Sequence, residues 1–450
     1  MINSKVIRNC LKVHFIGIGG VSMSGLARYL KNIGFSVSGS DIASSYYTKI
    51  LEDEGIKVYI GHCEDNVCGA DVVVYSSAVK EDNPELKYAV SNNKYVLKRS
   101  DLLRMVSELY NEKIGVAGCH GKTTATCMLA HIFDAANMEF GAHIGGHDNT
   151  LGNFVAKGNK YFISEICEYK KNISNFTPDI AVVLNIEADH MDCYNDLDEL
   201  SSCYFEFLNK AKYKIVCADD TILMKYDNSD KITFGFSDNA DYKAESIVNN
   251  DGYYSFEVVE RSKRIFKIKL NILGKHNILN ALAAIAAART AGIKPKDIKR
   301  GLKNFTGIRR RFEKIGILGG AQVIADYAHH PKQISLSVAS VRQAVTGKLF
   351  AVFQPHTYSR TIYLKDEFVK VLKNIDNLFI YKTYPAREEY MEGGSAKELY
   401  DMLPNASGYY ENMKDLKDRL ISEVGKGDVI LVLGAGDIYD LFSDELKQIK

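Results

Sequence analysis

Lys122 and Thr123 have the sequence surroundings of a phosphate-binding loop. They follow a glycine in the stretch IGVAGCHGKTT, residues 114–124, which begins as an apolar, strand-like run. In such loops the lysine brings a positive charge to the phosphates and the hydroxyl binds Mg²⁺. The common pattern, however, requires a glycine where this sequence has Val116. The residues alone leave two interpretations, a surface turn that contains a lysine or a variant phosphate loop.

Two further polar positions follow strand-like runs in the same part of the chain. Glu165 comes directly after YFIS, and His190 ends the stretch VVLNIEADH. The carboxyl ends of parallel strands meet at one edge of a sheet, so these side chains could face one nucleotide and its metal ions. Oxygen ligands suit Mg²⁺, whereas a lone histidine is unusual. The alternative is that Glu165 caps a helix and His190 is an ordinary loop histidine.

An earlier glycine-rich loop, GIGGVSMSG at residues 17–25, lies between a strand-like run and a helix-like stretch. Such a loop can hold a phosphate on the N–H groups of the helix. Asp41 lies where a dinucleotide-binding fold places a ribose-binding acid, but Ser22 stands where the GxGxxG fingerprint needs its last glycine. A dinucleotide, another diphosphate ligand and a tight turn without a ligand all remain open.

The elements that must position these residues alternate between strands and helices, which favours mostly parallel sheets. They form three α/β blocks in series, and we predict domains at residues 1–107, 108–308 and 309–450. Strand-like runs of the first block are at 13–18, 35–38, 58–60, 72–75 and 94–97, with a helix at 24–32. The second has runs at 161–163, 180–184 and 214–218, an antiparallel hairpin section at 231–270 and a helix at 277–288. The third has runs at 322–325, 349–353, 377–380 and 429–433.

Bulk properties exclude several classes of protein. The 450 residues carry a formal net charge of +1, which gives no global reason to expect nucleic acid as a partner. We find no run apolar enough for a signal peptide or a membrane span, so we expect no membrane insertion. The nine cysteines contain no CxxC pair, and we expect reduced thiols in a cytoplasmic protein.

Eight motifs occur in an order that resembles the Mur ligases: HFIGIGGVSMSGLA, GCHGKTTAT, NIEADHMD, LGKHNILNALAA, RRRFE, DYAHHP, FQPHTYSRT and GAGDI. The resemblance spans residues 13–438, and the first, sixth and seventh motifs are similar to those of the alanine-adding members. It implies a Rossmann-like UDP-binding domain, a central P-loop-type ATPase domain and a C-terminal Rossmann-like domain. The family's loop is Gly-x-x-Gly-Lys-Thr-Thr, so Val116 is no defect.

The resemblance also implies roles for individual residues. The UDP-substrate side would comprise Gly17, Gly19, Gly20, Ser22, Asp41, Gly145, Gly146 and Asn153. The ATP side would comprise Gly118, Cys119, His120, Gly121, Lys122, Thr123, Thr124, His276, Asn277, Asn280, Arg311 and Asp326. Magnesium would be bound by Thr123, Glu165 and His190. The alanine side would comprise His329, His356 and Arg360, the arginine being suited to a carboxylate by its fork of donors.

The implied activity is ATP-dependent ligation with UDP-N-acetylmuramate, L-alanine and ATP as partners and Mg²⁺ as cofactor. The lactyl carboxylate would attack the γ-phosphate of ATP, and the alanine amine would then attack the resulting acyl phosphate. Residues that would act in catalysis are Lys122, Glu165, His190, Arg311 and His329. Positioning and charge neutralisation would dominate, and His329 or His190 could accept the proton of the amine. We expect a monomer or a homodimer.

The chain departs from the family pattern at three points. Cys167 replaces an acid, Thr357 stands where some relatives have arginine, and no lysine precedes Lys210 in the region where some members carry a carbamylated lysine. Rival interpretations are a ligase that recycles a murein tripeptide, an NAD(P)-dependent oxidoreductase and a non-catalytic nucleotide sensor.

Overall fold

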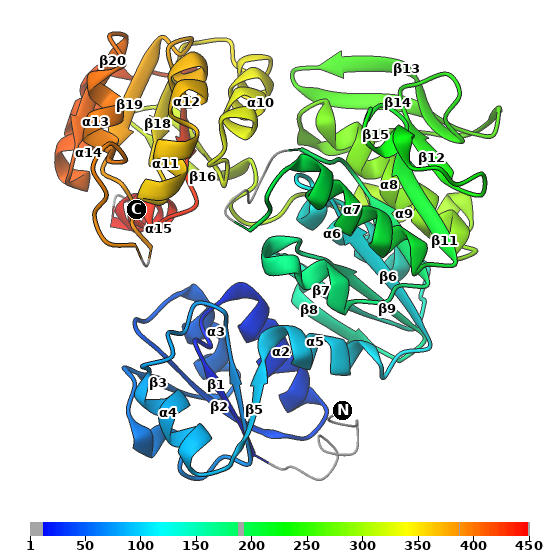
Figure 1. Cartoon of the computed structure of the whole chain (residues 1–450). Coiled ribbons are helices and arrows are strands. Elements are labelled where there is room, and N and C mark those ends of the chain that lie inside the picture. The colour runs from blue at the N-terminus through cyan, green and yellow to red at the C-terminus, as the bar shows by residue number, and fades with distance from the viewer. Residues whose placement is uncertain (1–11, 188–192, 387, 449–450) are drawn as a thin grey trace. The chain divides into compact units, whose positions relative to one another are not determined.

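The computed structural model describes residues 12–187, 193–386 and 388–448 (Figure 1). The chain divides into two compact units. Unit 1 comprises Met1–Glu245, Glu257–Ile268 and Leu279–Phe305, and unit 2 comprises Ser246–Phe256, Lys269–Ile278 and Thr306–Lys450. Among the described residues, no helix is both long and apolar enough to span a membrane.

The first sheet of unit 1 has the strand order β3-β2-β1-β4-β5, and every neighbouring pair is parallel. Its strands are β1 Lys12–Ile16, β2 Ser36–Asp41, β3 Lys57–Ile60, β4 Val72–Tyr75 and β5 Tyr95–Lys98. The helices are α2 Val21–Asn32, α3 Tyr46–Asp53, α4 Pro84–Ser91 and α5 Arg99–Ser107, with a short 3₁₀ turn at Glu64–Asn66. This is the Rossmann order, whose ligands bind where the strand order reverses. Here that point lies between β1 and β4, at the start of α2.

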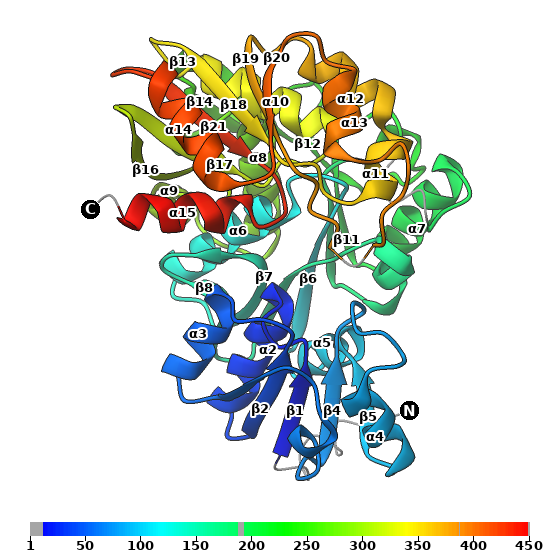
Figure 2. The same cartoon turned by 90° about the vertical axis from the view of Figure 1, so that its left-hand side faces the viewer.

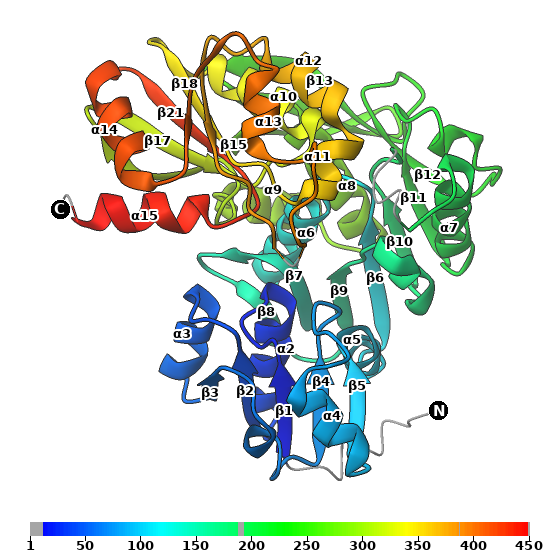
Figure 3. The same cartoon turned by 60° about the vertical axis from the view of Figure 1, so that its left-hand side comes forward.

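The second sheet has ten strands in the order β15-β14-β13-β12-β11-β10-β6-β9-β7-β8. The strands are β6 Glu112–Ala117, β7 Phe140–Asp148, β8 Gly152–Lys157, β9 Tyr161–Glu165, β10 Ile180–Val183, β11 Tyr213–Cys217, β12 Ile232–Gly235, β13 Tyr242–Asn250, β14 Tyr253–Glu260 and β15 Lys263–Leu273. Its helices are α6 Lys122–Ala135, α7 Leu197–Asn209, α8 His276–Thr290 and α9 Pro295–Asn304, with 3₁₀ turns at Tyr169–Asn175 and Leu223–Lys225. Figure 3 shows the parallel strands β6, β9 and β7 side by side, so their carboxyl ends share one edge.

The expected hairpin section at 231–270 is only partly correct. The connections at 251–252 and 261–262 have two residues each, all with positive φ, as tight antiparallel hairpins require. Strand β12, however, pairs in parallel with both β11 and β13. Alternation of apolar and polar residues reports a half-exposed strand but not the direction of its neighbour.

The third sheet, in unit 2, has the order β16-β17-β21-β18-β19-β20 and is parallel except for the β16–β17 pair. Its strands are β16 Glu313–Leu318, β17 Ala321–Asp326, β18 Leu349–Phe353, β19 Asn377–Tyr381, β20 Ala406–Tyr410 and β21 Val429–Leu433. The helices are α10 Pro331–Arg342, α11 Tyr358–Tyr363, α12 Lys365–Leu372, α13 Ala396–Asp401, α14 Met413–Glu423 and α15 Ile438–Gln448. Both faces of the sheet are buried, since Ala351 and Phe353 join one apolar cluster and Phe350 and Val352 join the other.

Within unit 1, α2 packs against β7 and β8 (Figure 2). Gly25 permits the close approach, because a Cβ there would lie 3.3 Å from the backbone oxygen of Asn153. The α/β fold with Rossmann-like sheets in series is confirmed. The domain limits at 107/108 and 308/309 stay predictions.

Candidate active site

The phosphate loop connects β6 to α6 in unit 1. Gly118 and Gly121 have φ values of 136° and 83°, which disfavour any residue with a side chain. Gly121 is the N-cap residue of α6 and provides no side-chain cap, so the first N–H groups of the helix can donate hydrogen bonds to an anion. Asn185 fixes the loop, since its Oδ1 accepts from the His120 N–H at 2.9 Å and its amide donates to the His120 carbonyl at 3.0 Å. The loop therefore fits phosphate groups.

Lys122 is held inside this loop by a buried carboxylate. Its Nζ donates to both oxygens of Glu168 at 2.9 Å and to the Gly118 carbonyl at 2.6 Å. The Glu168 side chain is fully buried. Burial alone would lower the pKa of Lys122, but the Glu168 carboxylate outweighs burial and raises it. The lysine is thus a fixed cation before any nucleotide binds.

Thr123 and Glu165 form an oxygen pair beside the lysine. The Thr123 hydroxyl donates to Glu165 Oε2 at 2.7 Å. Gly145, on β7, makes room for this carboxylate, because a Cβ at position 145 would overlap it. A hydroxyl and a carboxylate are the ligands that Mg²⁺ prefers, so both residues fit a magnesium ion, which would neutralise phosphate charge when bound. His190, the third predicted ligand, lies outside the described residues.

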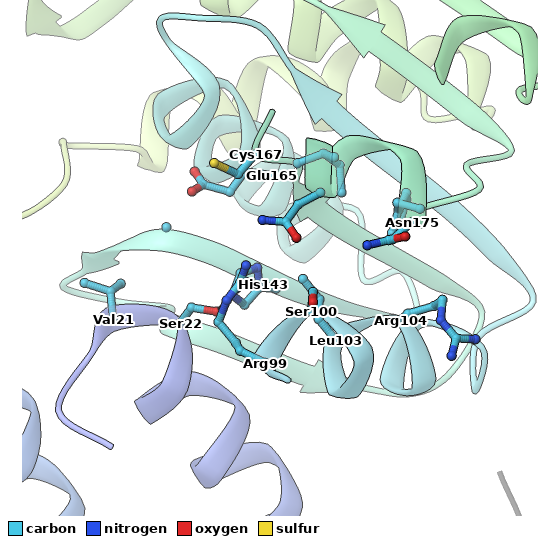
Figure 4. A pocket seen from close by; sticks show the side chains of 14 residues that line it. Val21, Ser22, Arg99, Ser100, Leu103, Arg104, His143, Glu165, Cys167 and Asn175 are labelled. Carbon is cyan, nitrogen blue, oxygen red and sulfur yellow. Dashed lines mark hydrogen bonds between the residues drawn. The ribbon is translucent and has the colours of Figure 1, made fainter. Parts of the chain in front are cut away.

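A cavity of about 230 Å³ opens on the other side of Glu165 (Figure 4). Its polar lining comes from α2, α5, β7, β9 and the residues that follow β9. The polar and charged lining residues are Ser22, Arg99, Ser100, Arg104, His143, Glu165, Cys167, Asn172 and Asn175. Glu165 therefore contacts the phosphate loop by its hydrogen bond with Thr123 and also lines the cavity.

The glycine loop at the start of α2 is held by its own neighbours. The Gly17 and Ile18 N–H groups donate to the Ser40 carbonyl, and the Gly19 N–H donates to Asp41 Oδ2 at 2.8 Å. Gly20 caps α2 without a side-chain bond, so the helix N-terminus can accept a diphosphate. Asp41 fixes the loop by this bond, and its predicted place on the substrate side stays a prediction.

Asn153 joins β8 to α2 by hydrogen bonds. Its amide nitrogen donates to the Val21 carbonyl at 2.7 Å and to Ser24 Oγ at 2.8 Å, and its Oδ1 accepts from Arg28 at 3.0 Å. The side chain thus ties β8 to α2, and its predicted contact with substrate stays untested.

In unit 2, the three residues predicted for alanine lie together. The rings of His329 and His356 are 6.0 Å apart, and Arg360 donates to His356 Nδ1 at 3.1 Å. Burial, and then the charge of Arg360, lower the pKa of His356 to about 4 and that of His329 well below its usual value. His329 is therefore neutral, with Nδ1 donating to the Tyr327 carbonyl at 2.9 Å. This leaves Nε2 as its basic nitrogen.

The remaining predicted residues belong to the ATP side, except Gly146 of the UDP-substrate side. Asn280 lies against Gly121, since a Cβ on that glycine would overlap the Asn280 amide. Asp326 accepts hydrogen bonds from the Phe312 and Ala328 N–H groups and from Ser337, so it organises its own loop. The remaining residues are placed as follows: Thr124 in the first turn of α6, Gly146 in β7, His276 and Asn277 at the start of α8, Arg311 over the Tyr327 ring, and the Cys119 thiol accepting from the Glu187 N–H. The roles of all of them stay predictions.

Sequence reasoning missed Arg99, Glu168 and Asn185. Asn185 stands in the NIEADHMD motif, and Glu168 lies one residue after Cys167 in a segment already singled out. The position of each residue within or beside a recognised motif was the signal that could have identified Asn185 and Glu168. Arg99 had none, because it lies in a charged stretch, LKRSD, that is typical of a solvent-exposed helix start.

The Rossmann order of the first sheet, the phosphate loop and the Thr123–Glu165 pair together define a nucleotide-dependent α/β enzyme. Three family models match along the chain: the Mur ligase family catalytic domain at residues 12–111, the Mur ligase middle domain at 116–288 and the Mur ligase glutamate ligase domain at 310–436. The chain belongs to the Mur ligase family.

Two relatives of high sequence identity carry the same enzyme name. A UDP-N-acetylmuramate–L-alanine ligase of Acetivibrio thermocellus is 42% identical over 447 residues, covering 97% of this chain and 95% of the relative. The enzyme of that name from Clostridium acetobutylicum is 41% identical, covering 96% of both chains. The crystal structure of UDP-N-acetylmuramate–alanine ligase from Thermotoga maritima superimposes with a TM-score of 0.84 at 28% identity, covering 98% of this chain and all of that one.

Proposed function

We propose that this chain is an ATP-dependent ligase that joins L-alanine to the lactyl carboxylate of UDP-N-acetylmuramate for peptidoglycan synthesis. Its relatives of that name match over nearly their whole length. The observation that carries the proposal is that Glu165 accepts a hydrogen bond from Thr123 of the phosphate loop and also lines the cavity. An acid bound in the cavity would lie next to the phosphate loop, as the formation of an acyl phosphate requires.

The residues of unit 1 supply positioning and charge for the first step. Lys122 presents its ammonium group to the phosphates, and the first turn of α6 supplies backbone N–H groups. Thr123 and Glu165 would hold magnesium. Such steps depend mostly on aligned reactants and neutralised charge. ADP and the activated acid are the products of this step.

The residues of unit 2 would bind the amino acid for the second step. Arg360 offers a guanidinium fork to the alanine carboxylate, and the neutral His329 offers Nε2 to the ammonium group. Loss of the ammonium proton frees the amine to attack the acyl carbon, and phosphate leaves. A neutral imidazole can accept that proton, although its low pKa makes it a weak base.

We place this reaction in the cytoplasm. All cysteines within the described ranges are free, as expected where thiols stay reduced. Whether the enzyme acts as a monomer or a homodimer stays a prediction.

A phosphate-release assay with UDP-N-acetylmuramate and ATP, supplied with one amino acid at a time, tests the function. We expect release with L-alanine and none with meso-diaminopimelate or a murein tripeptide. The reverse result would assign the chain to a recycling ligase. The variant Lys122→Ala should abolish release while circular dichroism shows a folded protein, and unchanged turnover would refute the role of the lysine.

A further inference from the structure

Arg99, the first residue of α5, is a cation on the wall of the cavity that borders Glu165. Figure 4 shows Arg99 and Ser22 on one side of the cavity, with Glu165 and Cys167 on the opposite side. The guanidinium donates through one nitrogen to Ser22 Oγ at 3.2 Å. In the part of the chain that the structure describes, Ser22 is its only hydrogen-bond partner, and no carboxylate lies within ion-pair distance of it.

A directional chain of hydrogen bonds fixes that guanidinium. Ser22 Oγ is 2.7 Å from His143 Nε2, His143 Nδ1 is 3.2 Å from Ser164 Oγ, and the Ser164 hydroxyl donates to the Glu165 carbonyl at 3.0 Å. Burial, and then the charge of Arg99, lower the pKa of His143 to about 3, so the ring is neutral. A neutral imidazole has one donor and one acceptor nitrogen. Because Ser164 already donates to the carbonyl, it accepts from Nδ1–H, and Nε2 accepts from the Ser22 hydroxyl.

The consequence is that Ser22 offers Arg99 an oxygen lone pair and nothing else. Arginine has five N–H donors in a planar fork, and this bond uses one of them. Burial lowers the pKa of Arg99, while the nearby Cys167 and Glu165 oppose that shift. A partly desolvated cation without an ion-pair partner gains most from an anion that brings two oxygens.

Arg104 provides the contrast within the same helix and cavity wall. Its guanidinium is 2.6 Å from Glu108 Oε1, in an i,i+4 pair whose arginine side chain is 41% exposed. Arg104 therefore already has its anion and is partly exposed to water, whereas Arg99 forms no ion pair among the described residues.

We propose that Arg99 binds the lactyl carboxylate of the substrate and directs it toward the side of the cavity formed by Glu165. This inference rests on the proposed function. The carboxylate is favoured over the diphosphate because the uncapped start of α2 already provides N–H groups for a diphosphate. The carboxylate must also reach the Glu165 side, where the nucleotide site lies.

Isothermal titration calorimetry of the full chain with two ligands tests the assignment. UDP-N-acetylglucosamine shares the nucleotide, diphosphate and amino sugar of UDP-N-acetylmuramate but lacks the lactyl carboxylate. The variant Arg99→Met should weaken binding of UDP-N-acetylmuramate by about 10- to 100-fold and leave binding of UDP-N-acetylglucosamine unchanged. Arg419→Met, the matched control, removes an arginine of another exposed i,i+4 ion pair that does not line the cavity, and it should change neither.

Equal weakening of both ligands would overturn the assignment, because Arg99 would then serve the shared part of the molecule. Unchanged binding of both ligands would overturn it as well. Should Arg99→Met fail to fold, Arg99→Lys decides, since charge without the fork should still weaken only the carboxylate ligand. Failure of the wild-type protein to bind either ligand would instead sink the proposed function.

Discussion

His143 should lower the stability of this protein as the pH falls below about 6.5. The imidazole is buried in β7, and both its nitrogens are used, one by Ser22 and one by Ser164. Protonation would force Nε2, which accepts from Ser22, to become a donor and would place a second positive charge near Arg99. The variant His143→Gln removes the titratable group and keeps a side chain that can accept from Ser22.

The expected magnitude follows from the two pKa values. The unfolded chain binds the proton near pH 6.5, whereas burial and Arg99 lower the pKa of His143 in the folded chain to about 3. Its contribution to stability is therefore complete above pH 6.5 and is lost as the pH falls from 6.5 toward 3. Between pH 8 and pH 5 the wild-type protein should lose about 2 kcal/mol from this residue alone.

Urea unfolding of both proteins from pH 8 to pH 5 measures this loss. At pH 8 the difference between wild type and His143→Gln reports the pH-independent cost of the substitution. Toward pH 5 that difference should shrink by about 2 kcal/mol, because only the wild type carries the histidine penalty. Parallel stability curves for the two proteins across the whole range would refute the reasoning, since His143 would then be protonated equally in both states.

Two substitutions near the phosphate loop give further tests. Glu168→Gln leaves Lys122 buried without its carboxylate, so the free energy of unfolding in urea should fall by about 3 kcal/mol, and an unchanged value would contradict the buried ion pair. Gly145→Ala would push the Glu165 carboxylate away from the loop, so phosphate release should fall about 100-fold. The melting temperature should fall only modestly. Gly69→Ala, at a glycine with open space around it, is the matched control, and equal loss in both alanine variants would exclude the steric explanation.

The parts of the site that the sequence predicted are those built from contiguous residues. Lys122 and Thr123 begin a helix directly after a strand, and Glu165 ends the neighbouring strand β9. Strand ends that share an edge bring their side chains together regardless of the details of packing. The Thr123–Glu165 pair was therefore accessible from motif order alone, and the structure places it as expected.

The parts that the sequence missed depend on packing between distant segments. Arg99 and Glu168 become informative only when α5 and the turn after β9 close around the cavity and the loop. The structure also adds a second task for Asn153 and Asp326, whose polar atoms hold segments of the chain together, while their predicted contacts with ligands stay predictions. A motif indicates that a polar residue has a partner, but the protein atoms that it contacts become known only from the packed structure.

The tie from Asn153 to α2 has a consequence for protein engineering. Because the side-chain amide of Asn153 in β8 bonds Val21, Ser24 and Arg28, the helix α2 that follows the glycine loop is anchored on a segment more than a hundred residues later in the chain. A chimera that exchanges only residues 1–107 for those of another ligase would separate the two halves of this joint. Exchanges that carry the β7–β8 hairpin with the first domain should preserve the joint, so the transferable module extends beyond the first sheet.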